Sequence, residues 1–161
     1  MVAQLDPVVE FREDHRQVRD DLLALASAAQ RGDLDGARAS LGRLDALVGP
    51  HFRYEEEALY PAMREFLGGY VDQLLAEHDT AISTARTAAE VLSQPALTEE
   101  ERGLVATAAR SLLVHVSNCD GLNILTERLT AERLGALAGA FEGARAANVP
   151  LLEWAATIRQ R

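Results

Sequence analysis

Residues 51–61 read HFRYEEEALYP and place His51 four residues before Glu55. Residues four apart lie on the same face of an α-helix, so the two side chains point the same way if the segment is helical. Imidazole and carboxylate groups together suit iron, manganese or zinc. The stretch therefore predicts a helix with two candidate metal ligands on one face, and Glu55 is placed to bridge two ions.

The residues around this stretch have the apolar period of a helix. Apolar side chains recur at alternating steps of three and four. The seam consists of Leu34, Ala37, Leu41, Leu44, Val48, His51, Glu55, Leu59 and Ala62. Pro50 predicts a kink just before His51, because proline removes a backbone hydrogen bond. Pro61 predicts a second bend or the end of the helix, and the glycine pair at 68–69 predicts a break.

Three other segments show the same spacing and predict three more long helices. The first spans about residues 6–30 and begins with Asp-Pro, an N-cap followed by proline at the first helical position. The next covers residues 71–92, and the last covers residues 98–129 and begins with a capping box. Four long helices with short connections predict an all-α fold, with residues 1–129 forming an up-down-up-down four-helix bundle.

The remaining residues, 130–161, are predicted to form a C-terminal helical extension. Two weaker helical patterns cover residues 131–147 and 150–161. We expect both helices to pack on the outside of the bundle. The alternative is that they form a dimer contact or a lid, anchored by Trp154.

Composition excludes several classes of protein. The 161 residues include 25 acidic and 16 basic side chains, and the net charge of -9 would repel a nucleic-acid backbone. No apolar run approaches the roughly 18 residues that span a bilayer. Cys119 is the single cysteine and cannot form an internal disulfide, and the first residues lack the apolar stretch of a signal peptide. We expect a cytoplasmic protein that binds neither nucleic acid nor membrane.

The chain has only four histidines, and each falls on the apolar seam of a different predicted helix. They are His15, His51, His78 and His115. A single buried histidine is readily explained as a packed side chain satisfied by a neighbour. Four that converge in one core predict a metal centre. No histidine follows a glutamate by three residues, which argues against the Glu-x-x-His pairs of ferritin-like centres.

Two residues after His115 are candidates to complete this centre. Cys119, four residues on, shares its face, whereas Asp120, five residues on, lies about 140° around an ideal helix. Asp120 reaches the centre only through a rotated or widened turn, which Gly121 would allow. From the residues alone, both remain candidates.

These motifs resemble the hemerythrin family, specifically the bacterial hemerythrin-like HHE cation-binding domains. The resemblance rests on EDHRQVR around His15, HFRYEEEALYP from His51, AEHDTAI around His78, and His115. It implies a four-helix bundle with a non-haem di-iron centre. In that pattern His15 and His51 hold one iron, His78 and His115 hold the other, and Glu55 bridges them.

The chain departs from the family pattern in two places. Many bacterial members have a glutamate where this chain has Cys119, whereas the likeness to oxygen-carrying hemerythrins implies Asp120 as the second bridging ligand. Those carriers also have two histidines one turn apart on the third helix, but here Leu74 and Ile82 flank His78 at that spacing. One iron then lacks a protein ligand, and an open position is typical of a metal that reacts with what it binds.

The resemblance and the open position favour a di-iron protein that binds and reacts with dioxygen, peroxide or nitric oxide. We expect an oxidase or a detoxifying protein rather than a reversible oxygen carrier; if it is an enzyme, it is a di-iron oxidoreductase. Two Fe ions are the expected cofactors, and the same ligands accept manganese or zinc. The expected partner is a small molecule, either one of these three or a small organic substrate. The sequence is also compatible with a homodimer. The alternatives are an iron- or oxygen-responsive sensor without turnover and a metal-depleted structural descendant.

Overall fold

The computed structural model describes residues 4–159 and is built from helices, with no strand in that range. The all-α class predicted from the sequence is therefore confirmed. In chain order the elements are α1 (Pro7–Arg31), α2 (Leu34–Tyr54), the π-helical turn η1 (Glu55–Leu59), α3 (Tyr60–Leu67), α4 (Tyr70–Leu92), α5 (Glu99–Ser111), α6 (Leu113–Asp120), α7 (Asn123–Thr126), α8 (Ala131–Ala147) and α9 (Leu151–Ile158).

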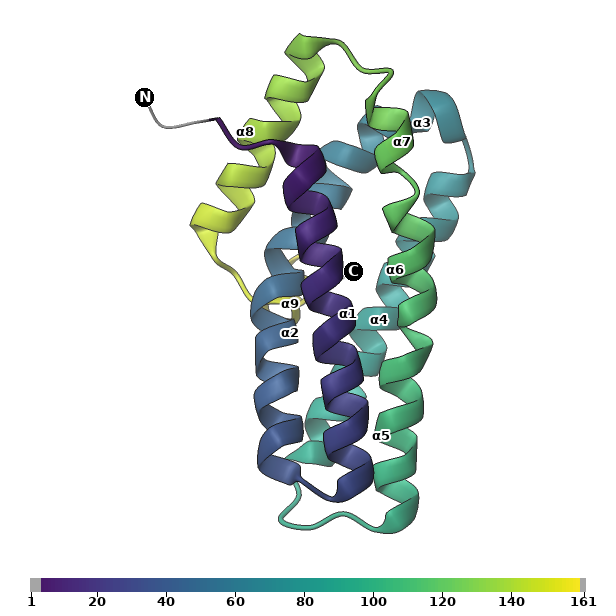
Figure 1. The fold of residues 1–161 in the computed structure, drawn as a ribbon, viewed down its shortest axis with the longest axis vertical. Helices are drawn as coiled ribbons and strands as arrows, with labels where there is room; N and C mark the ends of the chain where they lie inside the picture. Colours follow the sequence, from purple (N-terminus) through teal and green to yellow (C-terminus); the bar gives the residue numbers. More distant parts are fainter. Residues whose placement is uncertain (1–3, 160–161) are drawn as a thin grey trace.

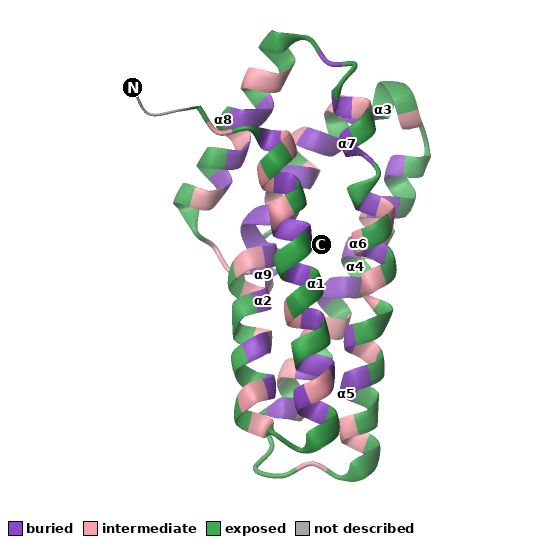
Figure 2. Cartoon of the chain, in the orientation of Figure 1, coloured by how far each residue is buried: buried purple, intermediate pink, exposed green. Residues whose placement is uncertain are grey.

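Four long segments lie side by side, and the chain reverses direction between one and the next (Figure 1). They are α1, α2, α4 and the α5–α6 segment; α1 packs against α2 and α5, while α4 packs against α2 and α5. Their buried residues face inward (Figure 2). The core has two apolar clusters, one containing Phe52 and the other containing Phe11. The histidine rings contact both phenylalanines, which places them where the two clusters meet.

The predicted helix starts are present. Asp6 caps α1 by accepting hydrogen bonds from the backbone N–H groups of Val8 and Val9. Thr98 and Glu101 form the capping box of α5, in which each side chain accepts from the other residue's backbone N–H. Both caps satisfy amides that have no partner within the first helical turn.

The second helix differs from the sequence prediction in how it accommodates its prolines. It continues through Pro50 to Tyr54 and then widens into the π-helical turn η1, where the Tyr60 N–H bonds to the Glu55 carbonyl. Pro61, which follows directly, has no N–H and its ring crowds the preceding turn. A widened turn relieves this crowding, so the bend predicted at Pro61 takes the form of η1.

The fourth helix is less continuous than its period predicts. It is interrupted at Leu112, resumes as α6, and ends at Asp120 before the short α7. Gly121 keeps right-handed helical angles at this end and forms no widened turn. The turn that would carry Asp120 toward the core is therefore absent.

The C-terminal extension packs on the bundle through both of its helices. Helix α8 contacts α1, α2 and η1, and α9 contacts α2 and α4. The segment between them crosses α2 so closely that a Cβ on Gly49 would lie 2.2 Å from the carbonyl oxygen of Val149. Trp154 is 4% exposed and belongs to the Phe52 cluster, so its ring is not free to anchor a dimer contact.

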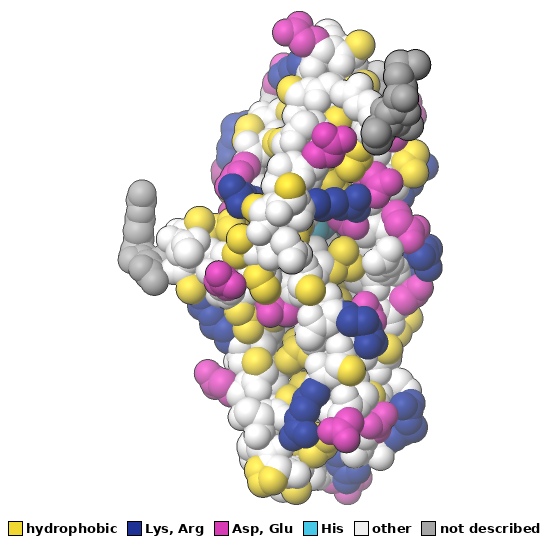
Figure 3. Space-filling model, turned by 90° about the vertical axis from the view of Figure 1, so that its left-hand side faces the viewer, with side chains coloured by type: hydrophobic (Ala, Val, Ile, Leu, Met, Phe, Trp, Pro, Cys, Tyr) yellow, Lys and Arg dark blue, Asp and Glu magenta, His cyan; other side chains and the backbone are white. Residues whose placement is uncertain are grey.

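On the face seen in Figure 3, acidic and basic side chains alternate between patches of apolar surface, and only a trace of histidine is visible. Among residues 4–159 no helix combines the length and the apolarity needed to cross a membrane.

Candidate metal centre

The structure brings the four histidines and Glu55 together in the bundle core. Each histidine comes from a different helix, α1, α2, α4 or α6, and all four are buried. Glu55, the first residue of η1, is fully buried between them. One candidate ligand group consists of His15, His51 and Glu55, with donor atoms that all lie within 4.8 Å of one another.

Glu55 lies between two pairs of histidines. Its Oε1 is 3.2 Å from His51 Nε2, and its Oε2 is 2.9 Å from His78 Nε2. The His51 Nε2 is also 3.2 Å from the Nε2 of His15. A carboxylate between two imidazole pairs is the arrangement that a bridging ligand requires, and the bridging role expected of Glu55 stays a prediction.

Cys119, rather than Asp120, completes the cluster. The Cys119 thiol is fully buried and donates to Glu55 Oε1 at 2.5 Å, and with Glu55 and His115 it forms the second candidate ligand group. The Asp120 side chain is 51% exposed, and its Oδ1 contacts His15 Nδ1 at 3.1 Å, outside the ring of inward-facing atoms. Because α6 ends without a widened turn, the geometry gives Asp120 a contact behind His15 and not the bridging position.

Every histidine has its own carboxylate on the outward nitrogen. The Nδ1 atom of each histidine bonds to one carboxylate. The pairs are His15 with Asp120, His51 with Asp14 (3.0 Å), His78 with Glu56 (2.8 Å), and His115 with Glu77 (2.7 Å). An ionised carboxylate only accepts, so each Nδ1 carries the proton. All four Nε2 atoms are thereby directed inward.

Three of these carboxylates were not predicted from the sequence. They are Asp14, Glu56 and Glu77. Asp14 and Glu77 each precede a histidine, in EDH and AEH, yet each bonds to a histidine of another helix. Glu56 follows Glu55 directly. The only sequence signal for these carboxylates was that they lie next to the histidine and glutamate motifs. Which histidine each one bonds to depends on how the helices pack, and the spacing of apolar residues does not specify this.

Two of the carboxylates are held by arginines of the C-terminal extension. Arg145 on α8 donates to Asp14 Oδ1 at 2.9 Å, and Arg159, just after α9, donates to Glu56 Oε1 at 2.5 Å. Asp14 is itself buried at 3% exposure. The extension thus contacts the groups that orient His51 and His78.

The electrostatics place positive charge on both sides of Glu55. Burial alone would raise the pKa of Glu55, but His51 and His78 hold it well below the usual value. Burial alone would lower the pKa of His51, but Glu55 and Asp14 raise it to about 10. The pKa of His78 is raised in the same way by Glu55 and Glu56 against the effect of burial. Without a metal, the protonated His51 compensates the buried carboxylate, and the raised pKa of His78 acts in the same sense.

Burial favours the neutral form of His15, His115, Cys119 and Tyr60. Burial and the charge of His51 lower the pKa of His15 to about 4. Burial also lowers the pKa of His115, assisted by His78. Burial and then Glu55 raise the pKa of the Cys119 thiol well above its usual value. The Tyr60 hydroxyl lies 3.0 Å from His78 Nε2, and burial raises its pKa, so it remains protonated.

The donor set fits a metal ion. His115 Nε2 and Glu55 Oε2 are buried and form no hydrogen bond with acceptable geometry in the described chain. Buried polar atoms without a partner are costly, and a metal ion would satisfy both. Imidazole, carboxylate and thiol groups together suit iron or zinc, and the outer carboxylates have the geometry that commonly supports metal-bound histidines.

Comparison with known proteins agrees with this geometry. A family model, the hemerythrin HHE cation binding domain, matches residues 6–122. This match covers the four histidines, Glu55 and Cys119, and ends before α8. Searches of curated proteins and of solved structures gave no match. The matched segment is most of the chain, which therefore belongs to the hemerythrin family of HHE cation-binding domains.

Proposed function

We propose that this chain is a di-iron protein that binds and reacts with dioxygen, peroxide or nitric oxide, as an oxidoreductase of the oxidase or detoxifying kind. We further propose that residues 1–129 are an up-down-up-down bundle that holds the centre and that residues 130–161 are an extension of it; residues 1–3 and 160–161 lie outside the described part of the chain. Manganese or zinc fits the same donors. Cys119 is the single cysteine and is buried, and the cytoplasm is the location we propose.

The observation that carries this proposal is the set of four outward carboxylates. Each one fixes an imidazole so that its Nε2 faces Glu55. A histidine that only fills space needs one hydrogen-bond partner, and no packing role requires four such pairs around one carboxylate. Conversely, metal-bound histidines commonly donate the other ring N–H to a carboxylate or carbonyl.

We assign the ligands from the atoms that converge. His15 and His51 would hold one ion, His78 and His115 the other, and Glu55 would bridge them. Cys119 shares a candidate ligand group with Glu55 and His115, so its sulfur would be a further donor. Asp120 supports His15 from outside.

Bound iron would supply a redox-active centre that accepts one of the three small molecules. The chain supplies the surroundings of that centre. The Tyr60 hydroxyl lies 3.0 Å from His78 Nε2 and 3.5 Å from Cys119 Sγ, so it holds a proton at the edge of the centre. The face of Phe52 stacks on His78 at 3.6 Å and keeps water from that side. These neighbours favour reaction with a small neutral molecule over exchange with ions.

The proposal is tested by mixing reduced, iron-loaded protein with dioxygen, hydrogen peroxide or nitric oxide under stopped-flow absorbance. We expect at least one of the three to change the spectrum within seconds, and the same reagent to leave Glu55→Gln unchanged or much slower. Absence of any spectral change with all three in fully loaded wild-type protein would contradict the reactive role.

A sensor is the second candidate function, because two arginines of the extension contact the centre's outer carboxylates. Metal loading would then alter how α8 and α9 dock. Limited proteolysis with and without iron tests this: a sensor predicts that cleavage within residues 130–159 slows on loading. Identical cleavage rates with and without iron would argue against the sensor role and leave the reactive role as the proposed function.

A further inference from the structure

The bundle contains an elongated apolar cavity that begins at the histidines. Its volume is about 370 Å³. The rings of His15, His51 and His115 form one end, and Leu25, Leu92 and Val105 lie toward the other end of the bundle. On α1 the lining extends from residue 15 to residue 25, a rise of about 15 Å at 1.5 Å per residue.

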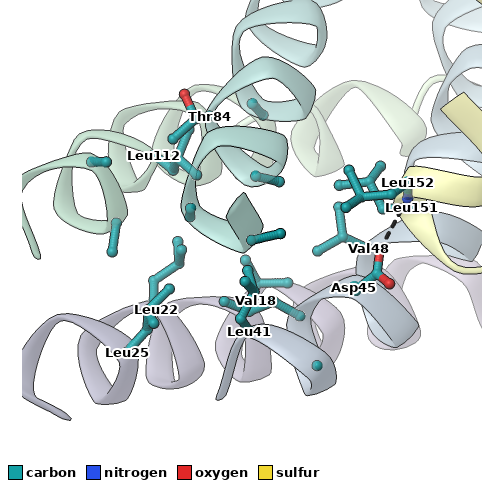
Figure 4. Close-up of a pocket in the computed structure, with 18 of the residues that line it drawn as sticks. Val18, Leu22, Leu25, Leu41, Asp45, Val48, Thr84, Leu112, Leu151 and Leu152 are labelled. Carbon is teal, nitrogen blue, oxygen red and sulfur yellow. Dashed lines mark hydrogen bonds between the residues drawn. The ribbon is translucent and has the colours of Figure 1, made fainter. Parts of the chain in front are cut away.

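The cavity wall is aliphatic. Figure 4 shows Val18, Leu22, Leu41, Val48 and Leu112 projecting into it from α1, α2 and the segment between α5 and α6. Protein interiors are packed to crystal density, and voids much larger than a water molecule are rare. A cavity of this size lies within the range of small-molecule binding sites.

The charged side chains at the rim are already paired. Arg38 donates to the carbonyl oxygens of Leu92 and Gln94, both at 2.7 Å. Asp45 accepts from the backbone N–H of Leu152 at 3.0 Å (Figure 4). A charged ligand would therefore lose its hydration without gaining a counter-charge in the aliphatic part of the wall. At the histidine end, His51 is already paired with Asp14 and Glu55.

We propose that this cavity binds an uncharged molecule with an unbranched aliphatic chain, with one end of the molecule against the histidine rings. The length and the aliphatic wall suit an extended chain better than a polar or compact ligand. Binding does not require a metal, so the site exists independently of the proposed reaction.

Titration of the full chain with straight-chain primary alcohols from 1-hexanol to 1-dodecanol, followed by calorimetry, tests the proposal. Affinity should increase about fourfold for each added methylene until the cavity is filled, and then level off. The stoichiometry should be one per chain. Decanoate at pH 8 should bind at least tenfold more weakly than 1-decanol. A rise with no plateau, or decanoate binding as tightly as 1-decanol, overturns the proposal.

Two variants locate the ligand. Ala85→Phe and Val18→Phe each place a ring in the cavity from a different helix. Leu104→Phe adds a similar ring at a position that is 61% exposed and serves as the control. We expect a loss of at least tenfold in 1-decanol affinity in either folded cavity variant and none in the control. Unchanged binding in a folded cavity variant overturns the proposal, and the alcohol series decides the matter if neither variant folds.

In the C-terminal extension, Arg145 and Arg159 each complete a chain of hydrogen bonds to the centre. One chain runs from Arg145 through Asp14 to His51, and the other from Arg159 through Glu56 to His78. One histidine of each proposed ion's pair is thus tied to the extension. The carboxylates behind the other two histidines have no arginine partner in the described chain.

We infer that Arg145 and Arg159 are positioning residues for the metal ligands, an inference that rests on the proposed centre. Each guanidinium fixes a carboxylate, and the carboxylate fixes the imidazole. The matched control is Arg133, also on α8, which pairs with Glu65 on the surface and contacts no histidine-bound carboxylate.

The test compares the rate at which a chelator removes zinc from wild type, Arg145→Gln, Arg159→Gln and Arg133→Gln. We expect about threefold to tenfold faster loss in the first two variants and none in the third, with partial rescue by Arg145→Lys. Rates within twofold of wild type in both variants overturn this inference. If the wild type itself holds no metal, the proposed function fails instead.

Discussion

His51 is held at both of its nitrogens, by Asp14 on the outside and by Glu55 and His15 on the inside. We predict that Asp14→Asn weakens metal binding by about 10-fold to 100-fold, because the amide no longer fixes the proton on Nδ1. Competition with a chelator measures this. Asp20→Asn, on the exposed face of the same helix, should bind as wild type; equal affinities in the two variants would refute the role of Asp14.

Metal uptake should release protons. The pKa of His51 is raised to about 10, so its imidazole is protonated at neutral pH and must lose a proton to bind a metal; the pKa of His78 is raised as well. Protonation favours the metal-free state, so apparent affinity should rise with pH, by up to about tenfold per unit for each proton released. Calorimetry in buffers of different ionisation enthalpy gives the proton count, and a count of zero at pH 7 would contradict the assigned charges.

Cys119 stabilises the metal-free protein through its bond to Glu55. Cys119→Ala removes a donor to a buried carboxylate, and we predict a loss of about 1–3 kcal/mol in the free energy of unfolding. Cys119→Ser retains a donor and should lose less. Urea denaturation of both variants without metal measures the difference, and a serine variant less stable than the alanine variant would argue against this bond.

Among the individual residues of the centre, the sequence predicted only a part. The convergence of the four histidines and Glu55 was predictable because rare residues fell on apolar seams, which is a property of each helix alone. Asp120 was misplaced and Asp14, Glu56 and Glu77 were missed because their partners lie on other helices, at rotations that the period does not determine.

Among the helices, the π-helical turn η1 is the feature that the spacing of apolar residues could not specify. The sequence showed that Pro61 disturbs the helix, but whether the chain kinks, ends or widens depends on what the following turn packs against. The π-helical turn keeps the helix continuous while Glu55 and Glu56 both face the centre, one inward and one behind His78. Single widened turns of this kind often occur at functional sites.

Helix α9 is a structural part of the bundle, and Trp154 holds it there. We predict that Trp154→Ala lowers the free energy of unfolding by about 3–5 kcal/mol, as for large-to-small changes in a core. Ile158→Ala, on the same helix but 41% exposed, should change it by about 0.5 kcal/mol or less. Similar effects of the two changes in chemical denaturation would mean that α9 is only loosely docked.

At the scale of the whole molecule, the acidic excess has two different uses. Carboxylates lie among arginines on the face seen in Figure 3, whereas Asp14 and Glu55 are buried beside the histidines. The sequence predicted the all-α class and the presence of an extension, because long amphipathic periods and caps are local signals. The contacts of the extension with the centre were not predicted, since they join residues more than 100 positions apart.

We propose that the histidine and Glu55 cluster binds two metal ions, and one measurement decides this proposal. It is tested most directly by elemental analysis of the full chain, produced in iron-supplemented medium without a histidine tag, beside a His51→Ala and Glu55→Gln double variant. We predict about two ions per chain in the wild type and a marked loss in the double variant, with helical content retained. Wild-type protein that is fully folded and metal-free, and stays so when iron, manganese or zinc is added, would contradict the claim.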